Sequence, residues 1–370
     1  MITQTLAIFH DAYRELNAKK LFWFVLIISG FVVLAFALMG INEEGVRIII
    51  WTIPLPFFNS NIISEETFYK LTFQNLGIGF WLSWVATILA LVSTAGMFPD
   101  FISSGSIDLM LSKPVSRLRL FLTKYFAGLI FVFLQVFVFC FASFLVIGFK
   151  AGVWDFSLFV AVPIVVCFFS YLFSVCVLLG IITKSTIASL LITLLVWFAA
   201  FGINTTEAIV LSGKVSSKYE VAAYREQVEN LQSRIKQTED EDKRDRLQLR
   251  LDHYKSGLLD SEKKQKTWNK VHRYVFAVKT VFPKTSETIA LLDRVLIPTE
   301  QMEKLVEHQT EQGSGMRFDN GEVRIDYVAQ NKELMQIQRS RSVTWILGTS
   351  LLFEVVVLGA GAWIFCRRDF

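Results

Sequence analysis

Long apolar runs are the feature that most constrains how this chain can fold. A helix of about 20 residues crosses the roughly 30 Å hydrocarbon core of a membrane, and several runs reach that length. Hydrophobic residues make up 53% of the sequence and charged residues only 19%. Because the hydrophobic residues are gathered into spans and not into one globular core, the sequence predicts an all-α integral membrane protein and excludes a soluble fold.

Six runs are predicted to span the membrane. They cover residues 21–40, 76–97, 125–149, 156–182, 187–203 and 343–366. The further apolar stretch Ile48–Ile63 contains two prolines and two asparagines and is flanked by glutamates. We interpret it as a non-spanning outer loop that touches the membrane interface. An even number of spans places both termini on the same side of the membrane.

The lysines and arginines of the short loops predict which side this is. Those on the side of the termini are Arg14, Lys19, Lys20, Lys113, Arg117, Arg119, Lys124, Lys184, Arg367 and Arg368, while the other side has only Arg47, Lys70 and Lys150. The positive-inside rule therefore predicts a multi-pass protein of the cytoplasmic (inner) membrane with both termini in the cytoplasm. Membrane lipid is thus an expected partner, and the modest net charge of +4 implies no nucleic acid.

This topology divides the chain into four parts. Residues 1–20 carry apolar side chains at helical spacing and predict an interfacial amphipathic helix, with a helix packed on a protein surface as an equal alternative. Residues 21–203 hold the first five spans, with a cytoplasmic segment at 97–124, and residues 343–370 hold the sixth span and a cytoplasmic tail. Residues 204–342 then lie outside the cytoplasm, since long loops translocate largely regardless of charge.

Within 204–342, apolar residues repeat at intervals of three and four on both sides of the acidic run Glu239–Asp242. They are Val221, Tyr224, Val228, Leu231 and Ile235 before the run, and Leu247, Leu251, Tyr254 and Leu258 after it. Two helices folded back at the acidic run would bury both rows, so the pattern predicts an antiparallel helical hairpin of coiled-coil type. The charged faces are expected to be solvated, and binding of an extracytoplasmic protein is the alternative.

The rest of this segment shows shorter patterns. A helical stripe runs from Trp268 to Phe282, and a second amphipathic helix is predicted at residues 285–296, before Pro298. Residues 322–328 alternate apolar and polar side chains, which predicts a short strand.

The sequence shows no pattern typical of an active site. Gly180–Ser185 has a lysine and a serine in the order of a phosphate-binding loop, but it lacks the first glycine and does not follow a soluble strand. The four cysteines lie inside or at the end of apolar runs, and the four histidines lie outside the spans. Their spacing matches neither a disulfide framework nor a metal site, so no bound metal is expected.

Glu354 is the one acidic residue well inside a predicted span. A carboxylate is costly there and normally faces the bundle interior, a partner or a wet cavity. We expect a neutral or hydrogen-bonded glutamate that pairs with a polar residue such as Gln135, and a proton or substrate site is the alternative.

The segment Met97–Arg117 lies between the second and third spans and reads MFPDFISSGSIDLMLSKPVSR. Its apolar residues recur at helical spacing, which predicts a short amphipathic helix against the membrane. A proline and an acid after a span, followed by the closing Pro-Val-Ser-Arg turn, resemble the type-2 permease family of ABC transporters. The six-span layout and the long connection before the last span are also similar. The chain looks closest to the subgroup of nitrous-oxide-reductase maturation and gliding-motility permeases.

This resemblance implies a dimer with a second permease subunit, the same or different, and a dimer of cytoplasmic ATP-binding-cassette ATPases. ATP and Mg would be bound by those partners, so the chain itself is expected to be no enzyme and to bind no cofactor directly. The residues that the resemblance assigns to ATPase coupling are Pro99, Asp100, Gly105, Asp108, Pro114 and Arg117. Asp100 stands where the family more often has glutamate, and the insertion 204–342 is larger than the usual loop.

The expected function is therefore export of an unidentified substrate, driven by ATP hydrolysis on a separate subunit. The lack of a phosphate-binding loop agrees with a motor on another chain. The alternative is a non-transporting membrane scaffold whose helical hairpin binds an envelope partner.

Overall fold

The computed structural model describes residues 20–54, 59–60, 62–103, 116–313 and 323–368. The predicted interfacial helix at 1–20 therefore lies outside the described residues, apart from Lys20. Contacts divide the chain into two compact units. The first unit comprises the residues up to Phe201, Phe282–Thr299 and the residues from Ser342, and the second comprises Gly202–Val281 and Glu300–Arg341.

Six helices in the described part of the chain are long and apolar enough to cross a membrane. They are Lys20–Leu38, Glu65–Ile102, Arg117–Ala151, Phe156–Thr183, Thr186–Gln237 and Val343–Arg367. Each predicted span coincides with one of them, except that the first helix ends at Leu38, two residues before the predicted end at residue 40, and this confirms the prediction of membrane helices. The second begins at Glu65 and not at residue 76, and the fifth continues far beyond residue 203. A helix need not end where its side chains become polar, because its backbone hydrogen bonds are internal.

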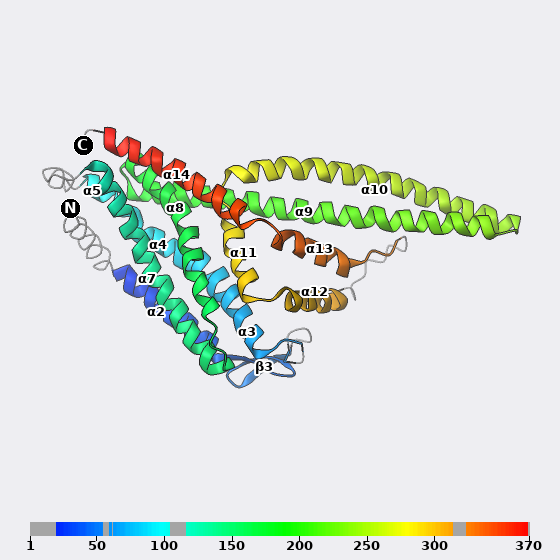
Figure 1. Ribbon diagram of the computed structural model, residues 1–370, viewed down its shortest axis with the longest axis horizontal. Helices are drawn as coiled ribbons and strands as arrows, with labels where there is room; N and C mark the ends of the chain where they lie inside the picture. Colours follow the sequence, from blue (N-terminus) through cyan, green and yellow to red (C-terminus); the bar gives the residue numbers. More distant parts are fainter. Residues whose placement is uncertain (1–19, 55–58, 61, 104–115, 314–322, 369–370) are drawn as a thin grey trace. The chain divides into compact units, whose positions relative to one another are not determined.

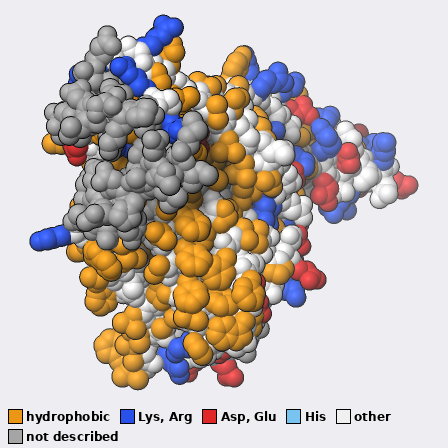
Figure 2. Space-filling model, turned by 60° about the vertical axis from the view of Figure 1, so that its left-hand side comes forward, with side chains coloured by type: hydrophobic (Ala, Val, Ile, Leu, Met, Phe, Trp, Pro, Cys, Tyr) orange, Lys and Arg blue, Asp and Glu red, His pale blue; other side chains and the backbone are white. Residues whose placement is uncertain are grey.

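Four helices form the body of the first unit. Each of the following packs on the next: α2 (Lys20–Leu38), α7 (Arg117–Ala151), α8 (Ala161–Thr183) and α14 (Val343–Arg367) (Figure 1). The short helix η3 (Phe156–Val160) leads into α8. Phenylalanine rings such as Phe131, Phe169 and Phe173 fill the space between the helices. Figure 2 shows a broad apolar surface, as expected of helices that face lipid.

The second membrane helix changes its winding along its length. It consists of α3 (Glu65–Thr72), η1 (Phe73–Ala86), α4 (Thr87–Thr94), η2 (Ala95–Met97) and α5 (Pro99–Ser103). η1 is a π-helix of 14 residues, a rare and wide form. The hydroxyls of Ser83 and Thr87 each donate to a carbonyl oxygen five residues earlier, at 2.7 Å. Both side chains thereby find a partner inside the span, where water is absent.

A small antiparallel sheet follows α2. It begins within the last two residues of the first predicted span and extends into the predicted outer loop Ile48–Ile63. Its strands are β1 (Met39–Ile41), β2 (Gly45–Ile48) and β3 (Trp51–Pro54). The side chain of Asn42 closes the first turn by accepting the N–H of Gly45 at 2.9 Å. The predicted all-α fold is therefore wrong at these residues, because strands of three and four residues are too short to give a clear alternating pattern.

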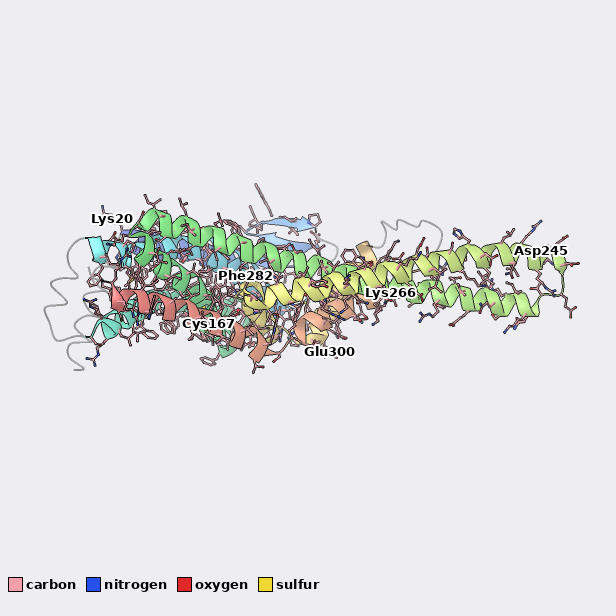
Figure 3. All side chains as sticks on the ribbon, turned by 90° about the horizontal axis from the view of Figure 1, so that it is seen from above. Lys20, Cys167, Asp245, Lys266, Phe282 and Glu300 are labelled. Carbon is pink, nitrogen blue, oxygen red and sulfur yellow. The ribbon has the colours of Figure 1, made fainter. Side chains whose placement is uncertain are left out.

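Two long antiparallel helices dominate the second unit. α9 (Thr186–Gln237) enters it from the first unit, and α10 (Glu241–Val281) runs back beside α9, as Figures 1 and 3 show. The buried contact consists of Val228, Leu231, Leu251 and Tyr254, with Tyr224, Ile235, Leu247 and Leu258 packed around them. α10 continues unbroken to Val281, so the predicted stripe at 268–282 belongs to the same helix.

Two shorter helices complete the second unit, α12 (Thr299–Gly313) and α13 (Tyr327–Arg339). The predicted strand at 322–328 is wrong, since residues 323–326 have no regular structure and α13 begins at Tyr327. Asp326 caps this helix by accepting the N–H of Ala329 at 2.9 Å. An N-cap carboxylate thus outweighs a pattern of only three alternating apolar residues.

α11 (Thr285–Leu296) forms where the sequence predicts a helix. It belongs to the first unit and packs on α8 and α14, with Thr288, Leu291 and Leu292 buried. The predicted outer segment 204–342 is therefore divided between the two units, because the amphipathic face of α11 finds its apolar partners among the membrane helices.

Replacing Leu251 with alanine should destabilise the α9–α10 hairpin by about 2–5 kcal/mol, because Leu251 is only 4% exposed and the change leaves a cavity. Leu249→Ala is the matched control, since Leu249 is 73% exposed on the same helix. Thermal unfolding of the full chain in one detergent, followed by circular dichroism, would measure both. Equal melting temperatures for the two variants would contradict the packing described here.

Candidate functional site

The predicted coupling residues mark the two ends of one segment. Pro99 and Asp100 open α5, and Arg117 opens α7. Gly105, Asp108 and Pro114, and with them most of the predicted amphipathic helix, lie outside the described residues. The contacts of the two ends therefore indicate which helices the segment joins.

One end of the segment is held against α8 and α9. The ring of Pro99 faces Gly180, where a Cβ atom would lie 3.1 Å from the ring. Asp100 Oδ1 accepts a hydrogen bond from the hydroxyl of Thr186 at 3.2 Å. Gly96 leaves room for the same carboxylate, because a Cβ atom at Gly96 would collide with Asp100 Oδ2. α5 thereby contacts both sides of the turn between α8 and α9.

The other end of the segment binds the last membrane helix. Arg117 Nη1 donates to the carbonyl oxygens of Cys366 at 3.2 Å and Arg368 at 2.8 Å. A cation suits this position, because the last carbonyls of a helix lack intrahelical partners and carry partial negative charge. Arg368 in turn donates to the carbonyl oxygen of Ile181 at 2.6 Å. These bonds tie together the adjacent ends of α7, α8 and α14.

Aromatic rings pack beside these polar contacts. Phe98, Phe121 and Phe365 come from the second membrane helix, α7 and α14, and their ring centroids lie 5.3, 5.8 and 6.3 Å apart. All three side chains are buried. Lys124 Nζ lies 4.2 Å from the ring centroid of Phe101 in α5. Because close-packed side chains do not deform continuously, a displacement of α5 would be passed to α7 and α14.

The chain matches the ABC-2 family transporter protein family over residues 6–370. It belongs to that family. No curated protein and no solved structure matches the chain. Family membership supports the permease component of an ABC transporter, a multi-pass membrane subunit that works with an ABC ATPase and is generally not itself catalytic. The finer subgroup named above stays a prediction.

Glu354 of this ABC-2 permease lies in a hydrogen-bonded cluster inside the membrane bundle. Its Oε1 accepts the hydroxyl of Tyr125 from α7 at 2.8 Å, and its Oε2 accepts the hydroxyl of Ser170 from α8 at 2.7 Å. The residue is 8% exposed. Both carboxyl oxygens thus have a partner, and the carboxyl group joins α14 to α7 and α8.

The expected hydrogen bonding of Glu354 to polar residues agrees with these contacts, but Gln135, named above as an example of such a partner, is not one of them. Its side chain is buried, and Gln135 Nε2 has no hydrogen-bond partner among the described residues. The error arose because Gln135 was chosen by residue type alone, whereas Tyr125 has both the position and the hydroxyl.

No group of three His, Cys, Asp or Glu side chains in the described part of the permease could hold a metal ion.

A second buried carboxylate, Glu207, was not found by sequence reasoning. It lies in the second unit and is 1% exposed. Glu207 Oε2 accepts Lys279 Nζ at 2.7 Å, and Oε1 accepts Arg341 Nη2 at 2.6 Å and contacts His272 Nε2 at 3.2 Å. One carboxylate therefore joins α9, the end of α10 and Arg341, which lies two residues before α14.

The surroundings of His272 in this cluster lower the pKa of its imidazole. Burial lowers the pKa of this imidazole most, and Lys214 lowers it further, which together outweigh the attraction of Glu207. Besides His272, the cluster brings two cations, Lys279 and Arg341, against the one carboxylate of Glu207. The sequence does show an acidic residue, Glu207, just beyond the fifth span and an arginine, Arg341, just before the sixth. Their positions in the sequence do not show that the two side chains are in contact.

Replacing Glu207 with glutamine should cost about 3–5 kcal/mol of stability, because the buried Lys279 and the half-buried Arg341 would lose the negative charge of this carboxylate. Glu229→Gln, on the exposed side of the same helix, should change stability by less than about 0.5 kcal/mol. Thermal unfolding of the three proteins would measure the difference. A Glu207→Gln variant as stable as the parent would show that the cluster does not hold these helices together.

Replacing Glu354 with leucine should destabilise the permease by about 1–3 kcal/mol, because two hydrogen bonds are lost and the hydroxyls of Tyr125 and Ser170 keep only the backbone carbonyl oxygens of Ser170 and Cys167 as acceptors. Glu354→Gln retains an oxygen acceptor, so its free energy of unfolding should lie within about 1 kcal/mol of that of the parent. Thermal unfolding of both variants would measure the difference between them. If glutamine proves as disruptive as leucine, the carboxyl group has an ionic role that hydrogen bonding does not supply.

Proposed function

We propose that this ABC-2 permease couples ATP hydrolysis by a separate ATPase to export of a substrate across the cytoplasmic membrane. Its input would be the cytoplasmic segment 97–124, and both termini would lie on the same side as that segment. A dimer of ATPase subunits would bind Mg and ATP, and a second permease subunit would complete the membrane part.

The observation that carries this proposal is the attachment of the segment at both of its ends. Pro99 and Asp100 contact the turn between α8 and α9, and Arg117 binds the carbonyl end of α14. A passive connector would need no such contacts. A force applied to the segment would therefore reach four of the membrane helices, α7, α8, α9 and α14, near one end of each.

The free energy for the motion would come from the ATPase. A partner can shift a conformational equilibrium only by its difference in affinity for the two states. An ATPase dimer that closes on ATP and binds one position of α5 more tightly would favour the corresponding arrangement of the spans. The permease needs no nucleotide site of its own for this cycle.

The scaffold alternative makes a different prediction about partners. A scaffold would bind an envelope protein through the α9–α10 hairpin and would recruit no ATPase. Co-expression of the permease with the ABC ATPases of the same genome, followed by purification of the permease and identification of any ATPase bound to it, distinguishes the two. Absence of any stable ATPase complex would remove the transporter proposal and favour the scaffold.

Arg117→Ala should uncouple the permease from its ATPase. The change removes two hydrogen bonds from a charged donor, worth about 1.5–3 kcal/mol each, so permease-dependent stimulation of ATP hydrolysis should fall about 100-fold or more. The measurement is the ATPase rate of the purified complex in lipid nanodiscs, with and without the permease.

Arg119→Ala is the matched control for this experiment. Arg119 lies two residues further along α7 and makes neither contact with α14. Its replacement should change the stimulated rate by less than about twofold. Equal losses for Arg117→Ala and Arg119→Ala would indicate a general effect of positive charge and would contradict transmission through the end of α14.

A further inference from the structure

The turn between β2 and β3 carries an exposed apolar surface. Five side chains form this surface, which we call the apolar tip: Ile48, Ile49, Ile50, Trp51 and Ile53. Ile50 is 81% exposed, the highest value among the exposed large hydrophobic side chains that the structure describes, and Trp51 is 78% exposed, a value that Phe149 shares. In water, a cluster of this size at the end of a hairpin would be unfavourable.

Backbone hydrogen bonds place the apolar tip beside the end of α2. Ile48 pairs with Met39 in β1, the residue that directly follows α2. The N–H of Ile49 donates to the carbonyl oxygen of Leu38, the last residue of α2, at 3.0 Å. The tip therefore lies at the level of the last turn of a membrane helix.

The lipid-facing stripe of α2 leads directly to this point. Its exposed large apolar side chains recur at helical spacing and are Trp23, Phe24, Ile27, Phe31, Leu34 and Leu38. Because α2 is a candidate membrane span, these side chains face hydrocarbon. The apolar tip begins where the stripe ends, so the two form one continuous apolar surface.

The opposite end of the sheet is polar. The turn between β1 and β2 contains Asn42, Glu43 and Glu44, and both glutamates are exposed. A strand of four residues separates the two turns by about 13 Å. One end of the sheet is thus suited to water and the other to lipid, and a tryptophan at the apolar end is typical of the membrane interface.

The backbone conformation of the turn is unfavourable for an isoleucine. Ile49 has a φ of 57°, in the left-handed region that disfavours β-branched residues. A two-residue hairpin turn normally takes asparagine or glycine at such a position. An isoleucine there is unfavourable for the turn itself, and contact of its side chain with lipid would offset that cost.

We propose that the apolar tip inserts into the boundary between lipid headgroups and acyl chains and anchors the end of α2 in the membrane. The occupant of this surface is the lipid of the membrane that α2 spans. A second protein copy or a soluble partner would instead cover the tip with protein. The proposal does not rest on the proposed transport function, since it needs only that α2 spans the membrane.

Site-directed spin labelling tests the depth of the tip. The four native cysteines are replaced by alanine, a nitroxide is attached to Ile50→Cys or to Glu44→Cys, and the full chain is reconstituted in phosphatidylcholine vesicles. The measured quantity is the ratio of the nitroxide's collision rate with dissolved oxygen to its collision rate with a water-soluble nickel chelate. This ratio should be severalfold higher at position 50 than at position 44. Equal access of the nickel chelate to both positions would overturn the proposal, and so would exclusion of both reagents from position 50, which would mean a protein cover.

A second comparison tests whether the apolar side chains hold the sheet in lipid. The double substitution Ile49→Asn and Ile50→Gly suits the turn, and it removes two of the five side chains of the apolar tip, including the most exposed one. With the nitroxide at Ile53→Cys, the double substitution should raise access of the nickel chelate severalfold. Unchanged access in a protein with an unchanged melting temperature would show that the tip does not anchor the sheet.

Discussion

The absence of water inside the membrane is the constraint on which most of this structure depends. A polar group in hydrocarbon must find its partner within the protein, and the first unit meets this demand with few groups. The indole N–H of Trp81 donates to the hydroxyl of Ser29 at 3.0 Å, which joins the second membrane helix to α2. Glu354 uses both carboxyl oxygens in the same way. These two polar contacts therefore also specify which helices are neighbours.

The sequence predicts the membrane helices well because length and hydrophobicity are sufficient for them. It also predicts α11, which is bracketed by Pro283 and Pro298. The continuation of α9 to Gln237 could not be predicted from hydrophobicity, which ends near residue 203. The glutamates, lysines, glutamines and arginines that follow are good helix formers, so the helix leaves its apolar surroundings without a break. The small sheet was missed because its short strands lie within one apolar run.

The contacts of the candidate site could not be predicted, because they join residues that are distant in the sequence. Arg117 binds carbonyl groups 249 and 251 residues away, and Glu354 finds its hydroxyl partners 229 and 184 residues away. The family resemblance selected Arg117 as a position of interest but gave no partner for it. The local pattern showed that Glu354 must face the protein, and only the packing order of α7, α8 and α14 determines which side chains it meets.

Two of these contacts join the same pair of helices at different depths. Arg117 binds the end of α14, and Tyr125, about 12 Å further along α7, binds Glu354 within α14. Ser170 adds α8 at the level of Glu354, and Arg368 adds α8 at the end. Helices that are joined at two levels resist both sliding and rotation against each other. In the proposed cycle, α7, α8 and α14 would therefore move as one body, and the change of state would occur where this body meets α2 and the π-helical second span.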